Sequence, residues 1–238
     1  MSFLKAEWRK LALVNYSIDP DILKPYLPYG TELDLWNDHA YVSLVGFMFL
    51  NTRMLGMKIP FHINFEEVNL RFYVKRKEAG EWKRGVVFIK EIVPKPALTF
   101  VANTVYGENY ETMPMKHVWL EKESALEVSY QWKKSSKWHS FSVNASTECK
   151  DIAAGSETEF ITEHYWGYAQ VNGSRSNEYE VTHPRWQAYE VRSFDVDVDF
   201  GAVYGEAFDF LSKEKPLSVM LAEGSEITVE SKRVISSR

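Results

Sequence analysis

The sequence predicts a mainly β protein: an antiparallel barrel or cone of strands with few short helices, spanning residues 1–238 as a single domain. Aromatic residues make up 15% of the chain, and they favour the pleated, half-buried surfaces of sheets. Most segments alternate apolar and polar residues with a period of two, which is typical of strands with one buried face. Proline and glycine are scattered between these segments, so no linker or domain boundary is indicated.

Two short helices are expected among the strands. Asp19 is suited to cap the first helix, Pro20 fits its first turn, and Pro28 with Gly30 ends it. The second helix is expected over 201–211. Strands are expected at 33–36, 39–49, 65–75, 84–93, 97–106, 125–132, 138–147, 160–171, 178–182, 186–194 and 217–234. Sequential antiparallel pairs predict a meander or barrel, and a closed barrel can leave a cavity for one small ligand.

Composition excludes several classes of partner. The net charge is −5 and no basic patch stands out, so no nucleic-acid partner is expected. Cys149 is the only cysteine, which excludes an intramolecular disulfide and fits a reducing, cytoplasmic location. The first ten residues lack the apolar core of a signal peptide. The longest apolar stretch, 40–50, is shorter than the ~20 residues that cross a bilayer, so no membrane partner is expected.

Several segments in a fixed order carry a family resemblance. They are Asn15-Tyr16-Ser17-Ile18-Asp19-Pro20 with Leu27-Pro28-x-Gly30, Tyr41 to Phe47, Asn64 to Val74, Gly85-Val86-x-Phe88, Glu163-His164-x-Trp166-Gly167-Tyr168, and Glu178-Tyr179-x-Val181-x-His183-Pro184-x-Trp186. Together they resemble the YqjF-like family of uncharacterised conserved proteins. That family is similar in fold to acetoacetate decarboxylase, a β-cone or barrel with an internal pocket. The resemblance implies the fold more strongly than the activity, because one fold hosts many functions.

The resemblance also implies a test for imine chemistry. Acetoacetate decarboxylases use a lysine that forms a Schiff base, followed by a second lysine that lowers its pKa. Here the nearest match is Met113-Pro114-Met115-Lys116-His117, in which Met115 stands at the nucleophile's place and Lys116 at its neighbour's. Either Lys116 serves alone, or the decarboxylase chemistry is absent. The second reading is favoured, because a lone amine with a pKa of ~10.4 is almost fully protonated at neutral pH.

The strand at 65–74 has two faces of different character. Glu67, Asn69, Arg71 and Tyr73 share one face, and mainly apolar residues share the other. The polar face lies either in solvent or on the wall of a pocket. In a pocket, Arg71 would bind a carboxylate through its planar donor fork, Glu67 would act as acid, base or anchor, and Asn69 and Tyr73 would contact the ligand.

Two further segments supply candidates. His164 and Trp166 share one side of an alternating segment, where His164 is either a hydrogen-bonded structural group or a general acid or base. His183 precedes a proline and fits a turn or a ligand contact. Asp195, Asp197 and Asp199 alternate on one strand, but side chains ~6.8 Å apart cannot together grip one ion. No metal site or cofactor fingerprint is expected.

The first functional hypothesis is therefore a pocket for a small organic acid or carbonyl compound, with lyase-like chemistry. Glu67, His164 and, as an outside candidate, Lys116 would be catalytic, and Asn69, Arg71, Tyr73, Trp166 and His183 would bind the ligand. The second hypothesis is a non-catalytic domain that binds ligands or assembles into a homo-oligomer through its aromatic surface.

Overall fold

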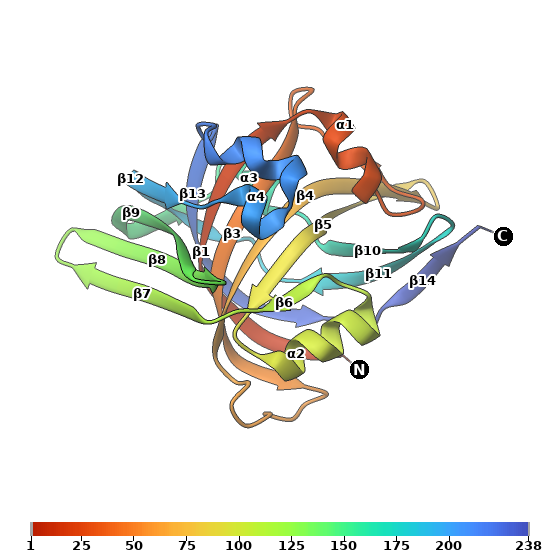
Figure 1. Ribbon diagram of the computed structural model, residues 1–238, viewed down its shortest axis with the longest axis horizontal. Helices are drawn as coiled ribbons and strands as arrows, with labels where there is room; N and C mark the ends of the chain where they lie inside the picture. Colours follow the sequence, from red (N-terminus) through yellow and green to blue (C-terminus); the bar gives the residue numbers. More distant parts are fainter. Residues whose placement is uncertain (1, 238) are drawn as a thin grey trace.

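A computed structural model describes residues 2–237 and consists mainly of one 14-stranded sheet (Figure 1). The strands are β1 (Leu4–Ile18), β2 (Glu32–Leu33), β3 (Ala40–Met54), β4 (Phe65–Glu78), β5 (Glu81–Val93), β6 (Tyr110–Thr112), β7 (Met115–Lys122), β8 (Ala125–Lys134), β9 (Lys137–Asp151), β10 (Trp166–Asn172), β11 (Arg175–Thr182), β12 (Gln187–Asp197), β13 (Ser218–Val229) and β14 (Arg233–Ser236). The helices are α1 (Pro20–Leu23), η1 (Lys24–Tyr26), α2 (Pro96–Val101), η2 (Ala102–Tyr106), α3 (Glu157–Thr162), α4 (Phe200–Tyr204) and η3 (Glu206–Ser212).

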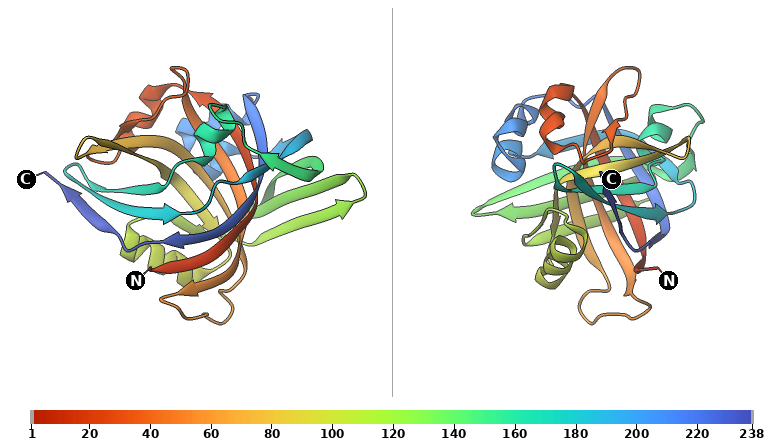
Figure 2. Two further views of the ribbon diagram at one scale, coloured as in Figure 1. Left: turned by 180° about the vertical axis from the view of Figure 1, so that it is seen from behind. Right: turned by 90° about the vertical axis from the view of Figure 1, so that its right-hand side faces the viewer.

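The sheet curls so that part of it closes on itself through strand pairing. Its order is β14-β11-β10-β5-β4-β3-β1-β13-β12-β9-β8-β7. Strand β11 also pairs with β13, through Val181 opposite Val229 and Thr182 opposite Thr228. The path from β13 through β1, β3, β4, β5, β10 and β11 therefore closes into a ring (Figure 2). The expected antiparallel pattern holds except where β5 pairs in parallel with β10 and β6.

Strands β1, β3 and β4 are buried on both faces, which separates the protein into two cores. Alternate residues of β4 show this division: Phe65 and Tyr73 pack in the core on the concave side of the ring. Val68, Leu70 and Phe72 pack on the opposite face, against β8, β9 and the helices α4 and η3. Burying each such side chain contributes about 1.5–3 kcal/mol, so the register of β4 is strongly fixed. This fixed register determines which side chains of β4 face the inside of the ring.

Two expected helices occur where the sequence placed them. Asp19 caps α1 and accepts a hydrogen bond from the Asp21 amide, and the second segment forms α4 followed by η3. Aromatic contact joins the two segments, because the rings of Tyr26 and Phe208 lie 5.6 Å apart at one end of the sheet. None of these helices, nor any other within residues 2–237, is long and apolar enough to cross a membrane.

Two segments expected as strands are helical instead. Residues 97–106 form α2 and η2, because Pro96 stands at the first helical turn and the segment lies against β6 (Figure 1). The beginning of the strand expected at 160–171 belongs to α3. Ser156 caps that helix by accepting from the Glu159 amide, so a Ser-x-x-Glu capping signal outweighed the alternating pattern.

Candidate ligand pocket

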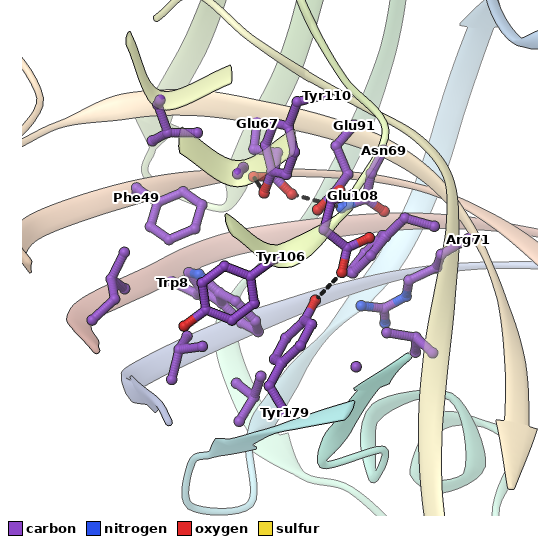
Figure 3. A pocket seen from close by; sticks show the side chains of 18 of the residues that line it. Trp8, Phe49, Glu67, Asn69, Arg71, Glu91, Tyr106, Glu108, Tyr110 and Tyr179 are labelled. Carbon is purple, nitrogen blue, oxygen red and sulfur yellow. Dashed lines mark hydrogen bonds between the residues drawn. The ribbon is translucent and has the colours of Figure 1, made fainter. Parts of the chain in front are cut away.

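The inside of the ring contains a cavity bounded by the strands β1, β3, β4, β5, β10, β11 and β13 and by the segment from α2 to β6 (Figure 3). The volume of this cavity that is open to the centres of water molecules is about 130 Å³. By the same measure one water molecule requires ~10–15 Å³, so the cavity has room for a ligand larger than water. Most of the wall is apolar, with Trp8, Phe49 and Phe88 among its side chains. A small polar group set into an apolar wall is the usual composition of a small-molecule site.

One edge of this polar group comes from β4. Glu67, Asn69 and Arg71 occupy alternate positions, line the cavity, and are only 2%, 1% and 7% exposed. Tyr73 continues the row but lies beyond the cavity wall, where its hydroxyl is hydrogen-bonded to Ser43 Oγ at 2.8 Å. The polar face of β4 is therefore turned inward and away from bulk solvent.

Two further glutamates complete a carboxyl cluster that the sequence did not reveal. Glu91 lies directly opposite Asn69 on the neighbouring strand β5, and Glu108 precedes β6. Figure 3 shows Glu67, Glu91 and Glu108 directed into the same cavity. The signal available in the sequence was Glu91 itself, a charged residue on the apolar segment Val86–Val93. Charged residues are rarely fully buried without a partner or a function.

Desolvation favours the neutral form of all three carboxyl groups. It raises the pKa of Glu67 to about 7, against the hydrogen bonds from Asn69 and Tyr110 and the charge of Arg71, which lower it. It raises the pKa of Glu108 to about 8, with the hydrogen bond from Tyr179 opposing the rise and the charge of Glu67 adding to it. Burial, followed by the charges of Glu108 and Glu67, raises the pKa of Glu91 well above its usual range. The cavity therefore holds groups that exchange protons near neutral pH.

Hydrogen bonds hold two of these carboxyl groups in place. Tyr110 donates to Glu67 Oε2 at 3.1 Å, and the Asn69 amide donates to Glu67 Oε1 at 2.9 Å. Tyr179 donates to Glu108 Oε1 at 2.7 Å (Figure 3). The ring of Tyr179 lies against Gly167, where a Cβ atom would be only 2.1 Å from Tyr179 Cζ. Glycine at this position therefore gives Tyr179 the space it needs to reach Glu108.

Arg71 has no counterion within the part of the chain that the structure describes. No carboxylate of residues 2–237 lies within 4.0 Å of its guanidinium, and its Nε is buried without a hydrogen-bond partner. Four more buried atoms of the cavity wall lack partners: Trp8 Nε1, Asn69 Oδ1, Glu91 Oε2 and His164 Nδ1. Buried polar atoms are almost always hydrogen-bonded, so these five atoms mark places where a ligand or water would bind.

His164 lines the cavity as a neutral imidazole. Its Nε2 lies 3.2 Å from Asp34 Oδ2, and Asp34 also accepts from Arg84 at 2.6 Å. Burial lowers the pKa of His164 to about 4, although the hydrogen bond to Asp34 raises it. The tautomer with hydrogen on Nε2 leaves Nδ1 as an acceptor toward the cavity.

The other residues singled out from the sequence lie in different places. Trp166 lines the cavity. His183 is outside the lining and stacks on Trp186 with ring centroids 4.1 Å apart. Lys116 lies on β7, exposed and outside the cavity, with its Nζ 4.6 Å from the ring centre of Trp138. No lysine is among the residues that line the cavity.

The alternating aspartates at 195, 197 and 199 lie on the surface or cap a helix. Asp195 and Asp197 are exposed on β12, and Asp199 caps α4 by accepting from the Ala202 amide. Across residues 2–237, no three His, Cys, Asp or Glu side chains are grouped so that they would hold a metal ion.

Comparison with known proteins places the chain among uncharacterised relatives. Residues 5–226 match the sequence profile of DUF2071, described as an uncharacterized conserved protein. The uncharacterized protein YqjF of Bacillus subtilis (strain 168) is 33% identical over 86 residues, which are 36% of this chain and 34% of YqjF. The alignment therefore spans about a third of that relative.

Solved structures confirm the expected resemblance in fold. Acetoacetate decarboxylase from Legionella pneumophila matches with a TM-score of 0.68 and 14% identity, covering 98% of this chain and 87% of that one. An acetoacetate decarboxylase-like enzyme from Sphingomonas wittichii RW1 matches with a TM-score of 0.66 and 11% identity, over 100% and 95% of the two chains. The enduracididine biosynthesis enzyme MppR complexed with pyruvate matches with a TM-score of 0.65 and 13% identity, over 99% and 91%.

Proposed function

The chain belongs to the DUF2071 family of uncharacterized conserved proteins, and we propose that it binds a small organic acid or related carbonyl compound in the cavity at Arg71. The observation that carries this proposal is the Arg71 guanidinium, buried, lining the cavity and without a carboxylate partner in residues 2–237. Arginine stays charged at all physiological pH values, so it cannot relieve its burial by losing a proton. A carboxylate ligand would supply the missing counterion and two parallel hydrogen bonds.

A neighbour in fold has been solved with a ligand of this class. MppR, which shares the fold at 13% identity, has been solved with pyruvate bound. Pyruvate is a small carboxylate with an adjacent carbonyl group, which is the class that Arg71 and an apolar cavity would select. Identity this low transfers the fold alone, so the support for binding by this chain comes from Arg71.

We further propose that Glu67 moves protons on the bound ligand, in a lyase-like or enolising reaction. A general acid or base works best when its pKa lies near the working pH, and the pKa of Glu67 is raised to about 7. In the neutral state that burial enforces, His164 Nδ1 would accept a hydrogen bond from the enol hydroxyl that such a reaction forms. Lys116 has no part in this proposal, because it lies outside the cavity lining.

Binding is tested by calorimetric titration with pyruvate, acetoacetate and propionate, each compared with the neutral ethyl ester of the same acid. The acids are expected to bind and the esters are not. Arg71→Met should weaken binding at least about thirtyfold, since losing one partner of a buried charge pair costs about 2 kcal/mol or more. Arg53→Met, on the exposed side of β3, is the matched control and should bind like the parent protein. Unchanged affinity in Arg71→Met would refute the proposal.

Proton transfer is tested by following exchange of the pyruvate methyl hydrogens for deuterium by NMR in heavy water. The parent protein should catalyse the exchange, and Glu67→Gln should bind pyruvate without catalysing it. Binding without exchange in the parent protein would favour the non-catalytic alternative. Borohydride reduction in the presence of acetoacetate should leave Lys116 unmodified, and an adduct there would restore the imine mechanism.

A further inference from the structure

The cavity holds more acidic groups than basic groups. Arg71 is the one arginine in the lining, whereas Glu67, Glu91 and Glu108 are three carboxyl groups. Within residues 2–237, no lysine, arginine or histidine nitrogen lies within 4.0 Å of any of these three carboxylates. A carboxylate ligand would neutralise Arg71 and leave the three glutamates in the neutral form that desolvation favours, with room for a cation beside them.

The partnerless atoms fall into two groups of opposite kind. Arg71 Nε and Trp8 Nε1 are donors that lack an acceptor. Asn69 Oδ1 is an acceptor that lacks a donor, and Glu91 Oε2, on the residue opposite Asn69 across β4 and β5, also has no partner. Asn69 cannot reverse this assignment by rotating its amide, because its nitrogen already donates to Glu67 Oε1 at 2.9 Å. The cavity thus suits a ligand acceptor at Arg71 and a ligand N–H donor at Asn69.

We infer that the pocket takes a small zwitterion, whose carboxylate binds Arg71 and whose protonated amine or guanidine binds Asn69 Oδ1 and the carboxyl cluster. The carboxylate half rests on the proposed function, and the cationic half is new. Asn69 and Arg71 are two residues apart on β4, which separates their Cα atoms by ~7 Å. A short chain between the two charged ends therefore suits the site.

The same arrangement makes cation binding release protons. The titratable and charged groups of the cavity lining are Glu67, Arg71, Glu91, Tyr106, Glu108, Tyr110, His164 and Tyr179. Of these, Glu67 and Glu108 are partly protonated near neutral pH, with pKa values of about 7 and about 8. A ligand cation beside them would stabilise their ionised forms and expel protons into the buffer. A carboxylate without an amine would have the opposite influence on them.

Calorimetric titration with two matched series tests the inference. The zwitterions are 3-aminopropanoate, 4-aminobutanoate, 5-aminopentanoate and 4-guanidinobutanoate, and the comparison compounds are propanoate, butanoate and pentanoate. At least one zwitterion should bind about tenfold more tightly than the carboxylate of equal length. Repeating the titration in buffers of different ionisation enthalpy should reveal proton release for the zwitterion alone.

Variants locate the effect within the cavity. Glu91→Gln should reduce the zwitterion's advantage over butanoate, measured on the same variant, to about threefold or less. The exposed Glu190→Gln is the matched control and should keep the full advantage. If Glu91→Gln fails to fold, the proton release measured on the parent protein decides the question.

The outcomes separate the two proposals. Equal affinity for zwitterions and carboxylates, without proton release, overturns the zwitterion and leaves the carboxylate site standing. Failure of both series to bind overturns both proposals. Zwitterion binding that is unaffected by Arg71→Met overturns the carboxylate end on which the inference rests.

Discussion

Gly167→Ala is expected to disrupt the cavity wall from a position without any functional side chain. Adding a Cβ atom at 167 would place it 2.1 Å from Tyr179 Cζ and 2.5 Å from the Tyr179 hydroxyl oxygen. Ordinary contact begins at 3.4 Å, so the ring must move by 3.4 − 2.1 = 1.3 Å at the least. Movement on this scale would stretch the 2.7 Å hydrogen bond from Tyr179 to Glu108 beyond its ~3.2 Å limit.

The cost has two parts. Overpacking a well-filled site costs about 1–3 kcal/mol. Separating a hydroxyl from its carboxylate partner costs about 1–3 kcal/mol more. A total near 3 kcal/mol would lower Tm by about 6–12 °C, since each kcal/mol shifts Tm by about 2–4 °C in a protein of this size. The backbone at 167 does not need a positive φ, so the loss would be purely steric.

Thermal unfolding followed by circular dichroism measures this loss. Gly173→Ala is the matched control, because a Cβ there meets nothing within 4 Å and the residue follows the same strand. It should change stability by less than about 0.5 kcal/mol. In a Tyr179→Ala background, Gly167→Ala should also cost less than about 0.5 kcal/mol, because the three nearest atoms all belong to Tyr179. Additive losses in this double-mutant cycle would refute the steric explanation.

Three further predictions concern buried charges. Glu178 is fully buried against Arg76, Lys83 and Arg233. Glu178→Gln should therefore lower the free energy of unfolding, measured in urea, by about 3–5 kcal/mol. The same change at the exposed Glu190 should lower it by about 0–1 kcal/mol. The pKa of Glu67 rises from 4.5 to about 7, so its stabilisation is complete below pH 4.5 and is lost as the pH rises through 7. Glu67→Gln should make the decline in the free energy of unfolding between pH 4.5 and 7 smaller by about 3 kcal/mol. Urea unfolding midpoints that fall with pH as steeply in the variant as in the parent protein would contradict the raised pKa of Glu67. Folding lowers the pKa of His164 from 6.5 to about 4, so the unfolded chain binds the proton first as the pH falls. Stability is therefore lost as the pH falls from 6.5 to 4. The NMR signals of the His164 ring protons should stay constant from pH 8 to 5.

Local patterns in the sequence determined much of the fold. Alternation along 65–74 placed Glu67, Asn69 and Arg71 on one face, because successive side chains of a strand point to opposite sides whatever the strand packs against. Asp19 and Pro20 located α1, since capping depends only on neighbouring residues. The same local rules contained the Ser156-x-x-Glu159 cap of α3, which the alternating pattern obscured.

Only the tertiary structure decided which face of β4 lines the cavity and which other residues line it. Glu91, Glu108 and Tyr179 come from separate segments, and no spacing in the sequence relates them to Glu67. They meet because β11 pairs with both β10 and β13 and so closes the ring around them. Lys116 is outside the cavity for the same reason, since β7 lies at the far end of the sheet order, beyond the ring. Periodicity fixes the face of a strand, whereas burial against distant strands determines what that face encloses.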